Sequence, residues 1–505
     1  MDFLMNHLLT LILFAPTALA VVLLLLPKDR VNLLRWFAFG ASLVPFILTL
    51  VLWWQFKPDQ PTFQFQEMVP WYPAIQSSYH VGIDGISLPM VLLTTLLTPL
   101  ALLASFSVVE RVKPYLFLFL VLETGMLGVF MSLDLLLFFV FWEIGLVPMY
   151  FLIAQWGGAN RNYASLKFIL YTMAGSLGLL LAIQMMGVVT GTFDLVKLFQ
   201  IWPAQTQGMM FGLPVATIKS IAFWAFVLAF AIKVPVWPFH TWLPDAHTEA
   251  PTAGSMILAG VLLKLGAYGF LRLVLPLFPQ ESAAYAGWLA ALGALAIIFG
   301  ALSAYGQTDF KRLVAYSSIN HMGFVVLGIA VSAKAAGTLD STIAVNGAVL
   351  QMFNHGLSAA GMFFLVGVIY ERAHTRDLNA YGGLWAVLPK YGTILLFTAM
   401  ASLGLPGLGG FVSEFLVVRG AWPVFTLATA LSMIGLFFTG AYILKALKLV
   451  LHGPLNEHWH HHPLPEISLR ETLVIAPLMA LMLVIGIWPA WLLDMINKAV
   501  MALKF

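Results

Sequence analysis

Long apolar stretches, separated by short polar segments, follow one another along the whole chain. Each stretch holds about 20 residues, which is enough for an α-helix to cross the hydrocarbon layer of a membrane. By the hydropathy criterion there are about fourteen of them. Their centres lie near Phe14, Val44, Leu97, Val121, Val140, Leu177, Val227, Leu262, Ala294, Val325, Met362, Thr398, Met433 and Met482. The pattern predicts an all-α polytopic membrane protein, because a backbone in lipid must satisfy its own hydrogen bonds.

The composition supports this prediction and excludes several classes of protein. Of the 505 residues, 61% are hydrophobic and only 9% are charged, whereas soluble domains carry roughly 25% charged residues. The chain has no cysteine, so disulfide scaffolds, thiol catalysis and cysteine-ligated clusters are excluded. The net charge of +3 comes from scattered basic residues, a pattern that does not indicate nucleic-acid binding.

Lysine and arginine residues predict the orientation in the membrane. With the N-terminus outside, more of them fall on the inner side, among them Arg161, Arg312 and Arg372. We therefore expect both termini on the outer, periplasmic side. Asp2 near the start and the apolar residues 21–26 after a small-residue site are untypical of a cleaved signal peptide. They favour an uncleaved first span.

Two of the predicted spans contain helix breakers. Pro235 interrupts the stretch Phe230–Phe239, and Pro406 interrupts the glycine-rich stretch Leu403–Phe411. Proline removes a backbone donor and clashes with the preceding turn. In a membrane the freed carbonyls must face protein or water, so a broken helix typically lines a polar cavity. A simple packing kink is the alternative interpretation of each break.

The two breaks suggest an internal repeat. Each lies in the fourth helix of a five-helix block, and the blocks cover residues 114–275 and 276–450. Because the number of helices per block is odd, the two copies would have opposite orientations, which is the inverted architecture of many transporters. Residues 1–113 would form an N-terminal three-helix segment, and residues 451–505 an inner loop and the last transmembrane helix.

Ionisable residues lie inside the predicted spans. A charge at the bilayer centre costs about 2.5–3.5 kcal/mol by insertion scales, so such residues are functional candidates. A lysine can hold or release a proton as its distance from a carboxylate changes, and histidine titrates near neutral pH. The combination is typical of proton relay. The candidates are Glu143, Lys233, Lys264, His321, His355 and Glu414.

Simpler interpretations stay open for these and for other residues. An embedded lysine or glutamate can form a static pair between helices, and a core histidine can be merely hydrogen-bonded. Glu123 is also embedded and is expected only to hydrogen-bond a neighbouring helix. The histidine-rich residues 457–462 lack the ligand spacing of a metal centre and are expected to be solvated. No metal site is predicted.

The motifs around these residues resemble those of a known family. The chain is similar to the antiporter-like membrane subunits of proton-pumping NADH:quinone oxidoreductase, respiratory complex I. The likeness extends over nearly the whole chain and is carried by Lys233–Thr252, Lys311–Gly323, Asn354–Ser358, Glu371–Asp377 and Phe411–Phe415. Of the three antiporter-like chain types, L, M and N, the M type fits best. It has a glutamate where this chain has Glu414, and only a short stretch follows the last apolar run here.

The resemblance implies a fourteen-helix fold with two inverted five-helix repeats. By position, it implies that Glu143 pairs with Lys233 and tunes its proton affinity. Lys264 would be the central relay, and His321 and His355 would continue a hydrated axis at mid-depth.

The resemblance also implies a role for Glu414, which would hold a proton in the second half and lead toward the outer exit. Members of the family carry no cofactor of their own, so FMN, iron–sulfur clusters and quinone are expected in partner subunits. The implied partners are the other membrane subunits, especially the neighbouring chains L and N, together with membrane lipids. A bacterial inner membrane is the expected location.

Two other functions remain open from the residues alone. A multi-subunit cation/proton antiporter or a membrane-bound hydrogenase would use the same lysines, glutamates and broken helices. A purely structural spacer between other membrane chains would need none of them.

Overall fold

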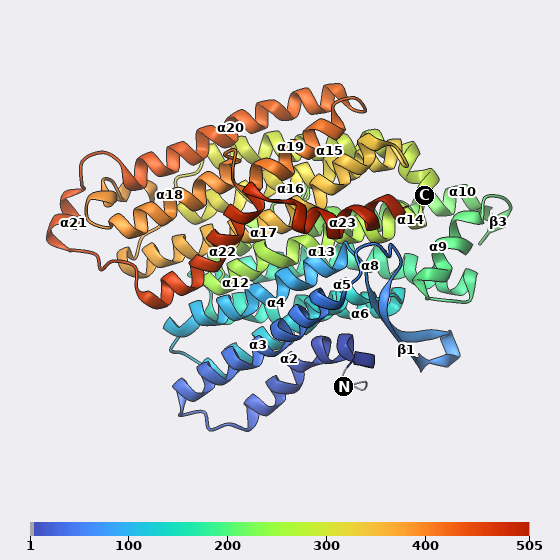
Figure 1. Ribbon diagram of the computed structural model, residues 1–505, viewed down its shortest axis with the longest axis horizontal. Coiled ribbons are helices and arrows are strands. Elements are labelled where there is room, and N and C mark those ends of the chain that lie inside the picture. The colour runs from blue at the N-terminus through green and yellow to red at the C-terminus, as the bar shows by residue number, and fades with distance from the viewer. Residues whose placement is uncertain (1–4, 504–505) are drawn as a thin grey trace.

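The computed structural model describes residues 5–503 and arranges them as a bundle of long helices that run side by side (Figure 1). Thirteen helices within these residues are long and apolar enough to cross a membrane. This confirms the predicted all-α polytopic fold. Asp2, which bears on the expectation of an uncleaved first span, lies outside the described residues.

The N-terminal part contains three membrane helices and a β-hairpin. The hairpin projects at the end of the bundle where α2 begins, and the backbone N–H of Leu9 donates to Glu67 Oε1 over 2.9 Å. We call this end the hairpin end. The elements are α2 (Leu8–Leu25), α3 (Val31–Gln55), β1 (Gln64–Tyr72), η1 (Pro73–Ile75), β2 (Ser77–Ile83), α4 (Ser87–Ala104) and η2 (Ser105–Ser107).

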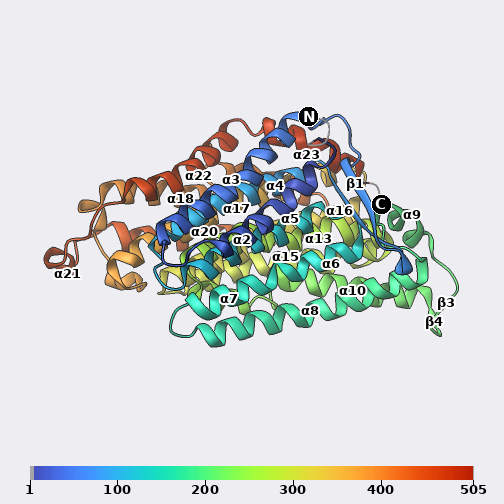
Figure 2. The same cartoon turned by 90° about the horizontal axis from the view of Figure 1, so that it is seen from below.

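The next part carries the first predicted break. Figure 2 shows α8 along one long edge of the bundle. The elements are α5 (Val112–Met131), α6 (Leu135–Ile144), α7 (Leu146–Trp156), α8 (Arg161–Thr190), α9 (Leu195–Ala204), β3 (Met209–Met210), β4 (Leu213–Pro214), α10 (Val215–Lys233), α11 (Trp242–Glu249), α12 (Thr252–Ile257), η3 (Leu258–Leu262), α13 (Leu263–Gly269), η4 (Phe270–Val274) and α14 (Leu275–Leu277).

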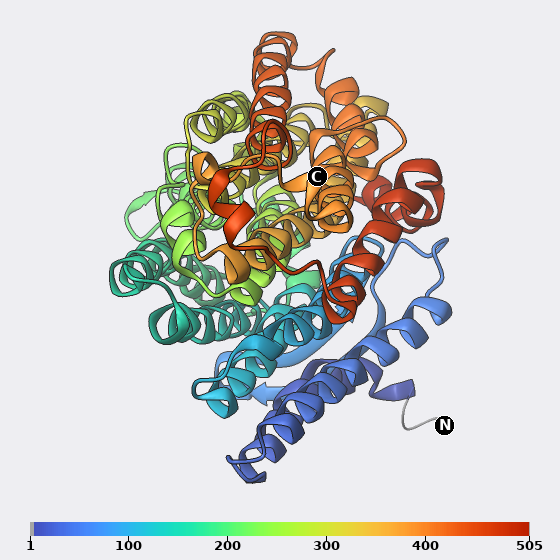
Figure 3. The same ribbon diagram turned by 90° about the vertical axis from the view of Figure 1, so that its left-hand side faces the viewer.

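The remaining part carries the second break. Viewed end-on, the blue N-terminal helices and the orange α20 lie at opposite extremes of the bundle (Figure 3). The elements are α15 (Pro279–Tyr305), α16 (Phe310–Ala335), α17 (Leu339–Ala373), η5 (Leu378–Ala380), η6 (Leu384–Ala386), α18 (Pro389–Leu403), α19 (Gly409–Ala421), α20 (Thr426–Leu451), α21 (Glu457–His461), α22 (Leu469–Ile487) and α23 (Ala490–Ala502).

Both predicted breaks are confirmed. Helix α10 ends at Lys233 and α11 begins at Trp242, while α18 ends at Leu403 and α19 begins at Gly409. With 15 and 13 residues, neither α18 nor α19 is long enough to span alone. This explains why the expected span near Thr398 is absent from the thirteen. Gly404, at the break, has a φ of +84°, a conformation that glycine adopts without strain.

Side chains of aspartate set where two of the important helices begin. Asp134 accepts from the backbone N–H groups of Leu136 and Leu137, both over 3.0 Å, and so caps α6. Asp309 accepts from the N–H of Arg312 over 2.9 Å and caps α16 in the same way. Such caps satisfy donors that have no partner within the helix.

Two spans lie at the centre of the bundle. The spans Thr252–Leu277 and Leu339–Ala373 are 100% buried over their most apolar window, whereas Leu8–Leu25 and Arg161–Thr190 at the periphery are only 39% buried. The outer helices therefore separate the two central spans from lipid. Polar side chains on the central spans face protein.

Small residues let α15 and α16 approach closely. A Cβ on Gly300 of α15 would lie 2.6 Å from the backbone nitrogen of Asn320 on α16. Small residues at helix contacts are the usual way in which membrane helices pack tightly, because lipid offers no hydrophobic driving force between them. This contact helps to set the position of α16, which carries His321.

The contact predicts the effect of one added methyl group. We expect Gly300→Ala to destabilise the protein by about 1–3 kcal/mol, the usual cost of overpacking, and to lower its melting temperature in detergent. Gly287→Ala is the matched control, since Gly287 lies on the same helix and a Cβ there would have no atom within 4 Å. Equal melting temperatures for the two variants would contradict the tight contact.

Candidate functional site

The central spans place two of the predicted residues in direct contact. Lys264 is fully buried, with 0% of its surface exposed. Its Nζ lies 2.7 Å from Nδ1 of His355 on α17 and donates to the carbonyl oxygen of Ala259. The two residues are far apart in sequence, and the packing of α12 and η3 against α17 brings them together.

The helix around Lys264 is irregular in a way that the sequence did not predict. Two π-helical turns, η3 and η4, flank α13 on either side. A π-helical turn shifts backbone hydrogen bonds from i−4 to i−5, and such turns occur frequently at functional sites. Ala259, whose carbonyl accepts from Lys264, lies inside η3. No proline or glycine pattern distinguishes these turns from an ordinary helix.

The contacts continue from His355 into the second half. The rings of His355 and His321 have centroids 5.7 Å apart. Nδ1 of His321 lies 2.7 Å from Oε1 of Glu414, and the same carboxylate oxygen accepts from Gln351 Nε2 over 2.8 Å. Lys264, His355, His321 and Glu414 thus form a row of buried polar side chains, which we call the polar row.

Uncharged side chains hold Glu414 in place at the second break. Asn354 Nδ2 donates to the carbonyl of Gly409 over 2.7 Å and to Ser413 Oγ over 3.1 Å. Ser413 Oγ in turn donates to Gln351 Oε1 over 2.5 Å. These bonds tie the first turn of α19 to α17. Sequence reasoning missed them, although Asn354 and Ser413 lie inside the motifs that carry the family resemblance.

Glu143 and Lys233 are near each other but are not in direct contact. Lys233 is the last residue of α10 and is 2% exposed. Its Nζ lies 4.9 Å from the centre of the Trp142 ring, so the ammonium group rests on an aromatic face. The charge of Glu143 still acts on Lys233. Glu143 Oε1 has no hydrogen-bond partner among the residues that the structure describes.

A further buried histidine, His247 on α11, was not singled out from the sequence. It is 0% exposed, and neither ring nitrogen has a hydrogen-bond partner within residues 5–503. Its ring stacks on Phe363 with centroids 4.3 Å apart, and the charges of Lys264 and Lys311 act on it. Its position directly after the first break was the signal that could have identified it.

A cavity of about 200 Å³ reaches this region from the end of the bundle opposite the hairpin. Gly158, Glu249, Lys311 and Arg376 contribute to its lining. Lys311 Nζ donates to the carbonyl of Ala250 over 2.5 Å. The cavity therefore leads from exposed residues to a buried lysine that lies within electrostatic range of His247.

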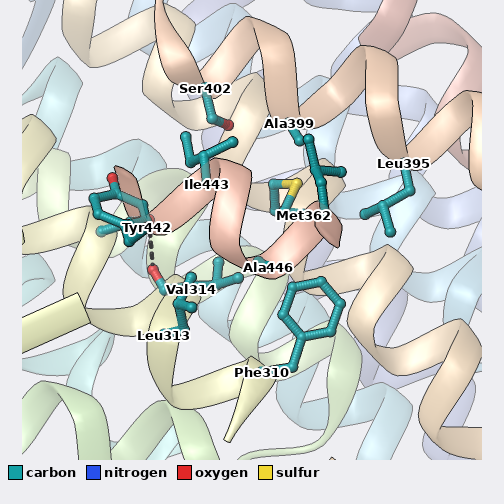
Figure 4. A pocket seen from close by; sticks show the side chains of 12 residues that line it. Phe310, Leu313, Val314, Met362, Leu395, Ala399, Ser402, Tyr442, Ile443 and Ala446 are labelled. Atoms are coloured by element: carbon teal, nitrogen blue, oxygen red, sulfur yellow. Dashed lines mark hydrogen bonds between the residues drawn. The ribbon is translucent and has the colours of Figure 1, made fainter. Parts of the chain in front are cut away.

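A much smaller cavity, of about 20 Å³, lies beside Tyr442 in the second half. Figure 4 shows the hydroxyl-bearing side chains Tyr442 and Ser402 at one end of it and the apolar Phe310 and Leu395 at the other. Tyr442 Oη lies 3.4 Å from Nε2 of His321. The volume is sufficient for one water molecule.

Two candidates from the sequence lie apart from the polar row. Glu123 on α5 is 0% exposed, and neither carboxylate oxygen has a hydrogen-bond partner in the described part of the chain. His458 and His462 lie on and directly after the short helix α21, and residues 5–503 contain no group of three or more potential ligands that could hold a metal ion.

Comparisons with known proteins identify the family of the chain. Residues 132–443 match the family model described as "NADH:quinone oxidoreductase/Mrp antiporter, TM", and residues 8–133 match "NADH-ubiquinone oxidoreductase chain 4, amino terminus". The chain is 42% identical to NADH-quinone oxidoreductase subunit M of Rhodobacter capsulatus, over 98% of this chain and 96% of the relative. It is 41% identical to subunit M of Escherichia coli strain K12, over 92% and 91%.

Solved structures give the same picture. Respiratory complex I from Thermus thermophilus contains a chain that superposes with a TM-score of 0.85 at 28% identity, over 98% of this chain and 99% of that one. A chain of the Mrp complex from Dietzia sp. DQ12-45-1b superposes with a TM-score of 0.83 at 21% identity, over 98% and 97%. The second likeness concerns the fold alone.

The support of the second break can be tested by substitution. We expect Asn354→Ala to remove the side-chain bonds to Gly409 and Ser413 that tie the first turn of α19 to α17, and to destabilise the protein by about 1–3 kcal/mol. Thermal unfolding in detergent and proteolysis at residues 404–408 measure the effect. Thr393→Ala is the control, because the hydroxyl of Thr393 is exposed and bonds only within its own helix. Unchanged stability of the Asn354 variant would contradict the assigned role.

Proposed function

The chain belongs to the subunit M family of NADH:quinone oxidoreductase, the proton-translocating respiratory complex I, and on this premise we propose that protons cross it through the polar row. One observation carries the proposal. The polar row lies at the centre of the bundle. A contact of 2.7 Å joins Lys264 to His355, and another of 2.7 Å joins His321 to Glu414. Titratable groups at this depth are costly, and a proton path is the use that explains a whole row of them.

The first step of the proposed path is proton uptake at the end opposite the hairpin. The 200 Å³ cavity leads to Lys311, and the charges of both Lys311 and Lys264 act on His247. A neutral imidazole can accept a proton on one nitrogen and release one from the other. Since both nitrogens of His247 lack partners within residues 5–503, it is suited to connect the cavity with Lys264.

The second step moves the proton sideways along the row. The ammonium of Lys264 can donate across its 2.7 Å contact to Nδ1 of His355. Nε2 of His355 has no partner in the described residues, and a proton released there must bridge the gap to His321 through water or ring rotation. His321 then delivers it to Glu414 across the second 2.7 Å contact.

Glu143 and Lys233 control the first step in this proposal. A Cβ on Gly266 would lie 3.0 Å from Lys233 Cβ, so α10 packs directly against the helix that carries Lys264. Positive charges on two helices that pack directly against each other repel more strongly in a medium of low dielectric constant than in water. When Glu143 attracts Lys233, this repulsion falls and Lys264 can take up a proton. When Lys233 withdraws, Lys264 releases it.

The energy for proton transport is proposed to come from other subunits of the complex. The redox reaction is proposed to take place in partner subunits that hold FMN, iron–sulfur clusters and quinone. Neighbouring chains of types L and N would flank this one in the bacterial inner membrane. The hairpin end would face the periplasm, as would both termini, and residues 114–275 and 276–450 would be the two inverted repeats. Identities of 41–42% with relatives named subunit M favour this role over a separate cation/proton antiporter.

Removal of a relay group tests the path. We expect Lys264→Ala or Lys233→Ala to lower NADH-driven proton uptake by inverted membrane vesicles roughly tenfold or more, since a lost proton-transfer group typically costs at least that much, while the complex still assembles. Glu143→Asp should be milder because the charge remains.

Lys445→Ala is the matched control, since its Nζ bonds only backbone carbonyls of Tyr305 and Gln307 near the end of the bundle. Normal proton uptake in the Lys264 and Lys233 variants would refute the path and support a purely structural spacer.

A further inference from the structure

A cavity of about 360 Å³ opens at the hairpin end of the bundle. Phe63, Gln66, Phe199 and Leu503 contribute to its walls, and Asp84 and Arg272 lie at its deep end. The exposed residues Pro61 and Thr62 at its rim connect it with the surface. In the proposed orientation this cavity brings periplasmic water to the helix that carries Lys264.

Asp84 and Arg272 close the cavity with a buried ion pair. Arg272 Nη2 lies 2.5 Å from Asp84 Oδ2, and each side chain is only 5% exposed. The other oxygen, Oδ1, accepts from the backbone N–H groups of Ile86 and Ser87, both over 3.0 Å. Both carboxylate oxygens are therefore occupied by donors.

The side chain of Tyr268 links this pair to the turn of helix that carries Lys264. Arg272 Nε donates to Tyr268 Oη over 3.2 Å, and that hydroxyl donates to the carbonyl of Phe130 over 3.0 Å. Tyr268 and Lys264 are four residues apart and so lie on one face of α13. The separation of Lys264 from Arg272 is about 12 Å along a helix.

We propose that Arg272 and Asp84 form an electrostatic plug that prevents protons in the outer cavity from reaching Lys264. A proton that binds Asp84 must displace the guanidinium group and leave it buried without a partner, which is strongly unfavourable. A fixed arginine also repels hydronium, as arginines do in pores that exclude protons. Without the plug, the outer water would connect with the relay and the proton gradient would run back.

The proposal rests on the proposed function, because it assumes that Lys264 carries protons. It adds that the first repeat is sealed on the outer side by these two residues, which do not contact Lys264 and reach its helix turn through Tyr268. They are positioning residues and take no proton themselves during turnover.

Passive proton leak of vesicles that contain the whole complex tests the plug. After a pH gradient is imposed without NADH, we expect Arg272→Gln to leak severalfold faster than the wild type, because Asp84 loses its partner and can then carry protons. With NADH, the same variant should oxidise NADH at no lower rate but accumulate a smaller gradient. Arg272→Lys keeps the positive charge, so its proton leak should be no faster than that of the wild type.

The Asp84→Asn variant distinguishes an electrostatic plug from an ion pair that only holds the two segments together. It breaks the ion pair as completely as Arg272→Gln does, but it leaves the positive charge, so the plug predicts a tight complex. A leaky Asp84→Asn complex, or a tight Arg272→Gln complex, would overturn the proposal. If the Arg272→Gln complex fails to assemble, the proton leak of the Asp84→Asn complex is the deciding measurement. A leak no faster than that of the wild type then supports the plug.

A double variant distinguishes this proposal from the proposed function. Arg272→Gln combined with Lys264→Ala should be tight again if the leak passes through Lys264. A leak that persists in the double variant would show that the plug exists and that Lys264 is not the relay.

Discussion

The constraint that shapes this protein is the absence of water around a helix in hydrocarbon. A polar group placed there must find its partner within the protein or remain unsatisfied at high cost. The central spans Thr252–Leu277 and Leu339–Ala373 carry lysine, histidine and glutamine, and the peripheral helices cover them completely. The polar row can exist only because the surrounding helices keep lipid away from it.

The same constraint explains the two breaks. At the second break, Asn354 Nδ2 donates to the carbonyl of Gly409 over 2.7 Å, beside a longer bond from Ser413 Oγ to the same oxygen. At the first break, Trp242 Nε1 donates to the carbonyl of Ile232 over 2.9 Å. Side chains thus donate to backbone carbonyls next to each break. Lys233 is the last residue before the first break, and Glu414 lies in the second turn of the helix that follows the second break.

Much of the fold could be predicted from the sequence, because hydropathy and proline act locally. The spans, both breaks and the depth of Lys264 and Glu414 follow from their immediate neighbours along the chain. The contacts between them do not, since Lys264 meets His355 across 91 positions and His321 meets Glu414 across 93. The π-helical turns, His247 and the support by Gln351 depend on tertiary packing. The expected pairing of Glu143 with Lys233 is looser than a direct contact because Trp142 occupies the space beside the ammonium group.

The aromatic face under Lys233 has a consequence for how that side chain moves. A hydrogen bond fixes both the distance and the direction of an ammonium group, whereas a π-face attracts it broadly and without a preferred angle. The terminal carbon atoms can therefore swing over the indole plane with little change in energy. The indole ring of Trp142 thus supports the ammonium group without fixing its direction. Lys233 can therefore change position in response to small changes in the local electric field, whereas a lysine in a rigid ion pair cannot.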